Sequence, residues 1–214
     1  MPRFMSSPKH RVQHFIKTQG PPVAARPRRL NCDKLRAAKA EFDKMERLGI
    51  IRRSDSPWSS PLHLVTKKDG SYRPCGDFRR LNVITEDDRY PLPHIHDFNA
   101  NLAGATIFSV IDLVKGFHHM PINKDDIPKT AVITPFGLYE FLRMQFGLKN
   151  AAQSFQRMME QILRGLDYVF IYLDDVLVAS ADMAQHESHL HTVFSLLQEH
   201  GMTCLLYTSD AADE

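Results

Sequence analysis

The stretch VFIYLDDVLVAS, residues 169–180, places two adjacent carboxylates inside an otherwise apolar run. Branched and aromatic residues on both sides are typical of buried β-strands, and Asp174 and Asp175 would form the turn that joins them. Neighbouring carboxylates repel each other, and burying them without a partner is costly. The stretch therefore predicts a hairpin whose turn needs positive charge from elsewhere.

A third carboxylate, Asp112, ends another predicted strand, TIFSVIDL at residues 106–113. Carboxylates at neighbouring strand ends repel at neutral pH, and a hard divalent cation removes that repulsion. Mg²⁺ accepts a few carboxylates together with substrate phosphates, and two such ions can promote phosphoryl transfer. An Asp-Asp turn by itself is more often structural, so this hypothesis depends on the whole set of carboxylates.

The segment LHLVTKKDGSYRPCGDFRRLN, residues 62–82, predicts a basic hairpin. Asp69-Gly70 is a hairpin turn signal, and residues 71–82 would form the return strand. Such cations are the usual ligands of triphosphate oxygens, although a solvated turn is the alternative interpretation. The cations of this hairpin are Lys67, Lys68 and Arg73.

Apolar residues recur at three- and four-residue spacing in three segments, which predict helices at 32–50, 153–166 and 186–201. Asn31 and Asp33 are alternative caps for the first helix. Helices and hairpins alternate without regular βαβ units, which favours an α+β fold with an antiparallel sheet. The histidines of the third helix have no cysteine or fourth ligand nearby, so we interpret them as surface side chains. They are His186, His189 and His191.

The net charge of +2 predicts no particular partner, but the first 30 residues contain basic and no acidic side chains. Such an arm suits a polyanion, and a solvated linker is the alternative. The three cysteines are widely separated, which fits a reducing compartment. The sequence has no apolar stretch long enough for a membrane span and no signal-peptide core. We therefore expect an intracellular protein without a signal peptide or membrane attachment.

Six segments, in order from Gly20 to Thr203, resemble the reverse transcriptases of gypsy-type long-terminal-repeat retrotransposons, which are retrovirus-related Pol polyproteins. The resemblance implies an RNA-directed DNA polymerase, a nucleotidyltransferase with a right-hand fold of palm and fingers. Its α+β palm would be an antiparallel sheet backed by helices. The segments are GPPVAARPRRL, LGIIRRSDSPWSSPLHLVTKKDGSYRPCGDFRRLN, RYPLPHIHDF, FSVIDLVKGFHHMPI, KTAVITPFGLYEFLRMQFGLKNAAQSFQRMM and YLDDVLVAS.

The same resemblance implies a division of the chain and the absence of a thumb. Residues 204–214, which match nothing in the family, are interpreted as translated read-through, with a divergent natural terminus as the alternative. We expect a basic Pro-rich linker at 1–30, fingers at 31–100 and 121–147, palm at 101–120 and 148–203 with the YLDD hairpin, and a non-family tail at 204–214.

By resemblance, Asp112, Asp174 and Asp175 are the catalytic carboxylates that hold two Mg²⁺ ions, with Mn²⁺ as an alternative. Arg73 and Lys67 would bind the triphosphate of the incoming dNTP. Lys68 is the alternative to Lys67, because the turn differs in length from the retroviral one.

Further positions follow from the resemblance. Phe117 would lie beneath the sugar and favour deoxynucleotides, with core packing as its alternative role. Phe146 and Gly147 would support the incoming base and the template, and Tyr172 would lie near the primer end. Asn150 is a candidate cap for the helix that follows. Asp77, Phe78 and Arg79 match a motif interpreted as structural support of the fingers.

The implied partners are an RNA or DNA template with its primer, dNTPs, and the protease, RNase H and integrase of the same polyprotein. The implied location is a cytoplasmic virus-like particle. Two alternatives stay open: a catalytically inactive nucleic-acid-binding remnant of the same fold, and a carboxylate-metal nuclease. The nuclease explains the carboxylates but neither the basic hairpin nor Phe117.

Overall fold

The computed structural model describes residues 10, 12–67, 70–93, 102, 104–113, 116–172, 175–202 and 204–206. The chain forms two compact units, each built from segments that are separate in the sequence. Unit 1 consists mainly of Val12–Asp88 and Met120–Ala151, and unit 2 mainly of Arg89–His119 and the chain from Ala152 onward. In the described part of the chain, no helix is long and apolar enough to cross a membrane.

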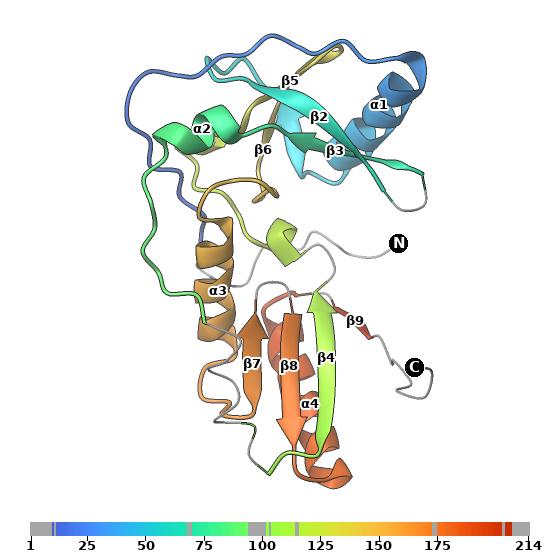
Figure 1. Ribbon diagram of the computed structural model, residues 1–214, viewed down its shortest axis with the longest axis vertical. Coiled ribbons are helices and arrows are strands. Elements are labelled where there is room, and N and C mark those ends of the chain that lie inside the picture. The colour runs from blue at the N-terminus through green and yellow to red at the C-terminus, as the bar shows by residue number, and fades with distance from the viewer. Residues whose placement is uncertain are drawn as a thin grey trace. The chain divides into compact units, whose positions relative to one another are not determined.

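Unit 1 is built on a five-stranded sheet (Figure 1). Strands β2 and β5 pair in parallel, and the other neighbours are antiparallel. The 3₁₀ turn η3, Ile127–Thr130, precedes β5. In spatial order the strands are β1 (Ile51–Arg53), β6 (Gly137–Phe141), β5 (Val132–Thr134), β2 (Ser60–Thr66) and β3 (Tyr72–Gly76).

Helix α1, Cys32–Arg47, packs against β1 and β3. Asn31 is its cap, because the Asn31 Oδ1 accepts a hydrogen bond from the Lys34 amide at 2.9 Å. Phe42 is 1% exposed on the buried face of the helix. Its ring meets aromatic rings of the sheet edge-on, which anchors α1 to unit 1. These rings belong to Tyr139 and Phe141, and to Phe136 in the β5–β6 turn.

The segment before α1 is packed onto unit 1, whereas the sequence predicted a linker. We call residues 12–25 the N-terminal strap. Ile16 of the strap is 2% exposed, and its amide donates to Asp126 Oδ2 at 2.9 Å. Lys129 Nζ donates to the Ile16 carbonyl at 2.7 Å. Burial alternates over residues 13–17 with His14 and Ile16 inward, but an alternation of one histidine and one apolar residue is too short to be recognised in the sequence.

The return strand of the basic hairpin ends earlier than predicted. Strand β3 stops at Gly76, and helix α2, Arg79–Ile84, follows where the return strand was expected. Phe78 is 2% exposed, and a Cβ added to Gly76 would lie 2.5 Å from its ring. The chain therefore turns back at Gly76, because burial of Phe78 favours the turn over a longer strand.

Unit 2 contains a four-stranded antiparallel sheet (Figure 1). Helix α4, Met183–Glu199, packs on β8 and β4. Helix α3, Ala151–Ile162, buries Phe155, Met158 and Met159 completely. The 3₁₀ turn η2, Gly116–His119, follows β4. In spatial order the strands are β7 (Val169–Tyr172), β8 (Asp175–Ser180), β4 (Ile107–Leu113) and β9 (Cys204–Leu206).

Strand β9 extends the sheet beyond residue 204, where the tail was expected to begin. It pairs with β4 through Leu113↔Cys204 and Ile111↔Leu206. Residues 207–214 of the predicted tail lie outside the described residues. The chain changes unit after Asp88, after His119 and after Ala151. The division into fingers and palm stays a prediction.

Candidate active site

Three side chains that the sequence singled out form a row across the unit 2 sheet. Asp175 of β8 is the register partner of Asp112 on β4 and of Tyr172 on β7. Directly opposed residues of an antiparallel pair project from the same face. Asp175 is exposed and Asp112 is half-buried, and Tyr172 is 40% exposed. Asp174, the third predicted carboxylate, lies outside the described residues.

Within the described part of the chain, the facing carboxylates have no protein partner for their charge. Among the described residues, neither Asp112 nor Asp175 has a side-chain hydrogen bond or an ion pair. Like charges directly opposite each other destabilise a sheet. Two such carboxylates on an open face fit Mg²⁺, which accepts carboxylate oxygens and leaves coordination positions for phosphate. Within the described residues no three metal-binding side chains come together.

Phe117 is part of the core of unit 2. It lies in η2, is 8% exposed, and packs edge-on against Phe155 with ring centroids 5.3 Å apart. A Cβ on the preceding Gly116 would lie 3.1 Å from the Phe155 ring, so glycine lets η2 approach α3. The alternative role of Phe117, core packing, is therefore present. Its predicted contact with the sugar stays a prediction.

Arg73 of β3 and Phe146 of the loop before α3 meet in unit 1. The guanidinium carbon of Arg73 lies 5.5 Å from the Phe146 ring centroid, within range of a cation–π interaction. Val65 is opposite Arg73 in the β2–β3 pair, and side chains alternate along a strand. Lys67, two residues beyond Val65, therefore projects from the same face of the hairpin as Arg73. Both cations are exposed, whereas Lys68 lies outside the described residues.

Gly147 adopts a backbone conformation that only glycine adopts easily, with φ of +85°. Its carbonyl accepts a hydrogen bond from Asn82 Nδ2 at 2.7 Å, and Asn82 Oδ1 accepts one from the Lys149 amide at 2.9 Å. The nearest atoms to an added Cβ would be 4.0 Å away. Gly147 is therefore required by its φ, and not by a close approach of other protein atoms.

Asn150 does not cap α3, in contrast to the sequence prediction. It has a positive φ of 65°, and its side chain is directed to an earlier part of the chain. Its Oδ1 accepts from the Asp88 amide at 3.1 Å, and its Nδ2 donates to the Glu86 carbonyl at 2.8 Å. The bond from Asp88 uses the Oδ1 that a cap would direct at the helix amides, and both bonds together fix residues 86–88 to the loop before α3.

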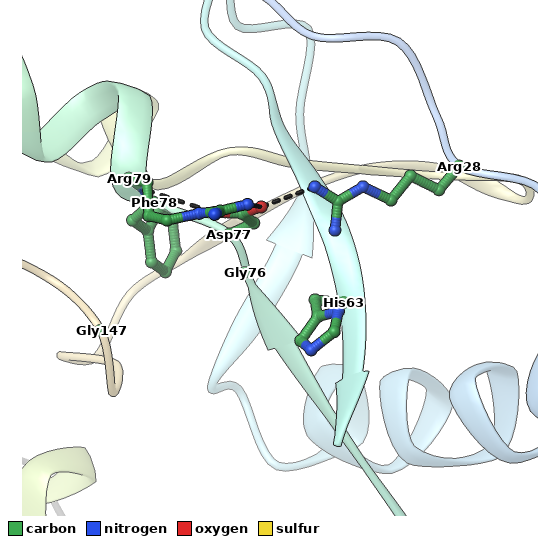
Figure 2. A pocket seen from close by; sticks show the side chains of 7 residues that line it. All are labelled: Arg28, His63, Gly76, Asp77, Phe78, Arg79 and Gly147. Atoms are coloured by element: carbon green, nitrogen blue, oxygen red, sulfur yellow. Dashed lines mark hydrogen bonds and ion pairs between the residues drawn. The ribbon is translucent and has the colours of Figure 1, made fainter. Parts of the chain in front are cut away.

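Asp77 binds two arginines at a pocket of unit 1 (Figure 2). Its Oδ2 lies 2.6 Å from Arg28 Nη2 and 2.7 Å from Arg79 Nη2, and Arg79 Nε donates to Oδ1 at 2.8 Å. The bonds from Arg79, and then those from Arg28, hold the pKa of the Asp77 carboxyl well below its usual range. The pocket has a volume of about 360 Å³ and is lined by Arg28, His63, Gly76, Asp77, Phe78, Arg79 and Gly147.

Sequence reasoning missed Arg28 as a member of this site. The basic residues at the start of the sequence predicted only a charged segment. No local sequence pattern predicts a contact between Arg28 and Asp77, which lie 49 positions apart. The 77–79 motif was interpreted as structural support, and the ion pairs of Asp77 fit that role. The guanidinium groups at the pocket also offer hydrogen-bond donors that suit phosphate.

Solved structures of foamy virus protease-reverse transcriptases have the same fold as this chain. The chain aligns over 92% of its length with a prototype foamy virus protease-reverse transcriptase, with a TM-score of 0.83 and 24% identity, covering 26% of that chain. A foamy viral protease-reverse transcriptase in complex with an RNA/DNA hybrid gives a TM-score of 0.84 at 23% identity, covering 92% of this chain and 27% of that chain. The predicted α+β right-hand polymerase fold of palm and fingers is thus confirmed.

The sequence comparison identifies the family. Residues 65–205 match the reverse transcriptase (RNA-dependent DNA polymerase) family, and the chain belongs to it. The Pol polyprotein of the Drosophila melanogaster transposon opus is 41% identical over 182 residues, 81% of this chain and 18% of that protein. The Pol polyprotein of transposon gypsy from the same organism is 38% identical, covering 76% of this chain and 16% of that protein. The predicted resemblance to gypsy-type elements is confirmed, and the chain spans less than one fifth of these relatives.

Proposed function

We propose that this chain is the RNA-directed DNA polymerase part of a retroelement Pol polyprotein and transfers dNMP to a primer 3′-hydroxyl. The observation that carries the proposal is the facing pair Asp112 and Asp175, unpaired within the described residues, in a chain of the reverse transcriptase family. We infer that unit 2, which holds this pair, is the palm. Unit 1, which holds the basic hairpin, would be the fingers.

The reaction forms a bond between the primer 3′-oxygen and the α-phosphorus and breaks the bond between that phosphorus and the leaving pyrophosphate. The hydroxyl proton passes to solvent. Asp112, Asp174 and Asp175 would hold two Mg²⁺ ions, which activate the hydroxyl and neutralise phosphate charge. β-strand pairing places Asp112 of β4 opposite Asp175 of β8, so these two ligands are neighbours before an ion binds.

The residues of unit 1 would bind the nucleotide by charge. Arg73 supplies a planar donor fork for triphosphate oxygens, and Phe146 under its guanidinium limits the orientations of that fork. Lys67 adds a second cation on the same face of the hairpin. Charge that develops on the leaving pyrophosphate is stabilised by such fixed donors.

Nucleic acid is the proposed macromolecular ligand. Foamy viral relatives of this fold are known in complex with an RNA/DNA hybrid and with double-stranded DNA. Arg28 and Arg79 at the unit 1 pocket are suitable donors for backbone phosphates, which carry no sequence information. We expect the full-length polyprotein of the element to contain protease, RNase H and integrase as well. We expect it to be located in a cytoplasmic virus-like particle.

Primer extension on an RNA template with dNTPs and Mg²⁺ tests this function. We expect extension by the chain, and a loss on the order of 10²-fold or more in Asp112→Asn and Asp175→Asn, the scale for losing a preorganised electrostatic group. Asp167→Asn is the matched control, because Asp167 is an exposed carboxylate of the same unit. Undiminished extension by Asp112→Asn would exclude the proposed site.

A second outcome separates the inactive remnant from the polymerase. If the chain binds a primer–template but extends no primer, the remnant is favoured. The intact carboxylate pair argues against that outcome, because a decayed site would have no reason to keep facing charges that repel. Template cleavage without extension would favour the nuclease instead.

A further inference from the structure

His186 lies buried behind the unit 2 sheet, whereas the sequence predicted a surface position. It is 4% exposed and contacts two strands at once. Its Nε2 lies 2.8 Å from Ser109 Oγ on β4, and its Nδ1 lies 2.8 Å from Ser180 Oγ at the end of β8. A single imidazole of α4 thus joins β4 to β8 by side-chain hydrogen bonds.

A second histidine extends this contact. His189, one turn further along α4, has its Nδ1 2.9 Å from the same Ser180 Oγ. Its ring stacks on Tyr168, with centroids 3.4 Å apart and planes at 3°. We call Ser109, Ser180, His186 and His189 the serine–histidine cluster.

The cluster lies on the opposite face of the sheet from the facing carboxylates. Ser109 precedes Asp112 by three positions on β4, and Ser180 follows Asp175 by five on β8. Side chains alternate between the two faces of a strand, so an odd separation places residues on opposite faces. The cluster therefore connects β4 and β8 on the face opposite the carboxylates and towards the other end of their pairing, because Ser180 is the partner of Ile107 and Asp175 that of Asp112.

Counting protons shows how much charge the cluster holds. When both imidazoles are neutral, each of the three hydrogen bonds has one donor and one acceptor. Ser109 donates to His186, His186 to Ser180 and Ser180 to His189, or all three bonds run in the reverse order. One additional proton is also accommodated. Two additional protons leave Ser180 Oγ with two N–H donors, and its own O–H without an acceptor in the cluster.

The surroundings of the cluster also oppose positive charge. Burial, and then the neighbouring His189, lower the pKa of the His186 imidazole. The groups that face it are the two serine hydroxyls of β4 and β8, His189 of α4, and Tyr168 stacked on His189. Among the described residues no ion pair links the cluster to a carboxylate.

We propose that His186 is a positioning residue for the polymerase site: by holding β4 against β8 from behind, it keeps Asp112 and Asp175 opposite each other. The inference rests on the proposed function, which assigns the two carboxylates to metal binding. His186 itself touches neither metal nor substrate. Its loss should weaken divalent-metal binding, because the backbone ladder between β4 and β8 would then hold Asp112 opposite Asp175 without support from α4. Any freedom that the two ligands gain must be lost again when they bind an ion.

The test measures the Mn²⁺ affinity of the full chain by electron paramagnetic resonance, without nucleotide or nucleic acid. His186→Phe fills the site but removes both hydrogen bonds. We expect the Mn²⁺ affinity to fall, but by less than the roughly 10-fold or more that follows the loss of a group bonded directly to a metal ligand. The matched control is His191→Phe, because His191 is an exposed residue on the same helix. It should retain the affinity of the unmodified chain.

The measurement is made well below the unfolding temperature, with folding verified by circular dichroism. A folded His186→Phe chain with unchanged Mn²⁺ affinity would overturn the inference and leave His186 as a packing residue. If this variant fails to fold, Ser109→Ala removes only the β4 arm of the cluster. Ser109→Ala should lower the Mn²⁺ affinity by a smaller factor. An unchanged Mn²⁺ affinity in this variant would also overturn the inference.

Asp112→Asn separates this inference from the proposed function. If Asp112→Asn leaves the Mn²⁺ affinity unchanged, the proposed metal site is wrong, and so is the inference that depends on it. If Asp112→Asn weakens binding while folded His186→Phe does not, the metal site stands and only the positioning role fails. In primer extension, the His186 variant should lose kcat at saturating dNTP and keep its KM for dNTP.

Discussion

Arg28 and Asp77 form an ion pair of 2.6 Å although 49 positions separate them in the sequence. Arg79 binds the same carboxylate from the other side, so the arm before α1 and the start of α2 share one negative charge. The Asp77 side chain is 11% exposed, which limits how far water screens these pairs.

Replacing Asp77 with Asn should destabilise unit 1, because two guanidinium groups would then share a neutral amide. We expect the free energy of unfolding at pH 7 to fall by about 1–3 kcal/mol, the scale for charge-assisted hydrogen bonds. The folded pKa of Asp77 is depressed, so its stabilisation is present above the usual carboxyl pKa and is lost as pH falls below about 4. Urea unfolding at several pH values measures both effects.

Asp43→Asn is the control for this prediction, since Asp43 is an exposed carboxylate of α1. It should leave the unfolding midpoint within experimental error. Equal stabilities of Asp77→Asn and the unmodified chain at pH 7 would show that the two ion pairs contribute nothing to folding.

His14 of the strap should make unit 1 sensitive to mild acid. It is 0% exposed, and burial lowers the pKa of its imidazole to about 4. The unfolded chain takes up a proton near pH 6.5 that the folded chain refuses, so stability falls as pH drops from 6.5 towards 4. Between pH 7 and pH 5 the loss is about 2 kcal/mol from this group.

Comparing His14→Gln with the unmodified chain isolates the contribution of His14 to the pH dependence of stability. The variant should lose less stability between pH 7 and pH 5 in denaturant titrations, whatever its stability at pH 7. His63→Gln serves as control, because His63 is an exposed histidine of the same unit. An identical pH slope in His14→Gln would mean that His14 is not neutral in the folded chain.

Arg73 should act on nucleotide binding more than on turnover. In Arg73→Ala we expect the KM for dNTP to rise on the order of 10-fold or more, since a charge-assisted donor is worth about 1.5–3 kcal/mol. Phe146→Leu should raise the same KM by a smaller factor, because the guanidinium would lose its aromatic support. Steady-state primer extension with varied dNTP gives these values.

Arg47→Ala provides the comparison for charge alone, since Arg47 is an exposed arginine of α1 in unit 1. Its KM for dNTP should not change. If Arg73→Ala and Arg47→Ala behave alike, the assignment of Arg73 to the triphosphate is wrong.

Phe117 should control the choice of sugar as well as core packing. Phe117→Val shortens the side chain beneath the predicted sugar position, so ribonucleotides should be accepted more readily. We expect the ratio of kcat/KM for dNTP over rNTP to fall by at least about 10-fold, the scale for one steric contact. Because Phe117 packs against Phe155, Phe117→Val should also lower the unfolding temperature.

Phe155→Leu tests the packing contribution separately, because Phe155 is fully buried beside Phe117. It should lower the unfolding temperature with less effect on the dNTP/rNTP ratio. A lower unfolding temperature with an unchanged ratio in Phe117→Val would leave Phe117 with a packing role only.

The elements that the sequence predicted best are those with a strong local period. Strands β4, β7 and β8 and helices α1, α3 and α4 follow from apolar spacing. Strand β3 was predicted too long, since burial of Phe78 is a tertiary effect that β-propensity does not contain.

The parts of the site that sequence reasoning missed are polar contacts over long separations. His186 was interpreted as a surface residue because no cysteine or fourth metal ligand lies near it in the sequence, yet two serines on different strands bind it. The separation of Ser109 and His186 is 77 positions, far beyond any local pattern. Hydrogen-bond partners of this kind become visible only when the strands are placed side by side.

The N-terminal strap also bears on how the chain would be released from a larger precursor. A protease that cut between residues 12 and 25 would detach Ile16 from its buried position, together with its main-chain bonds to Asp126 and Lys129. Maturation that leaves unit 1 intact must therefore cut upstream of the strap. Because its central residues are held by unit 1, the folded chain shields them from the extended binding that proteases require.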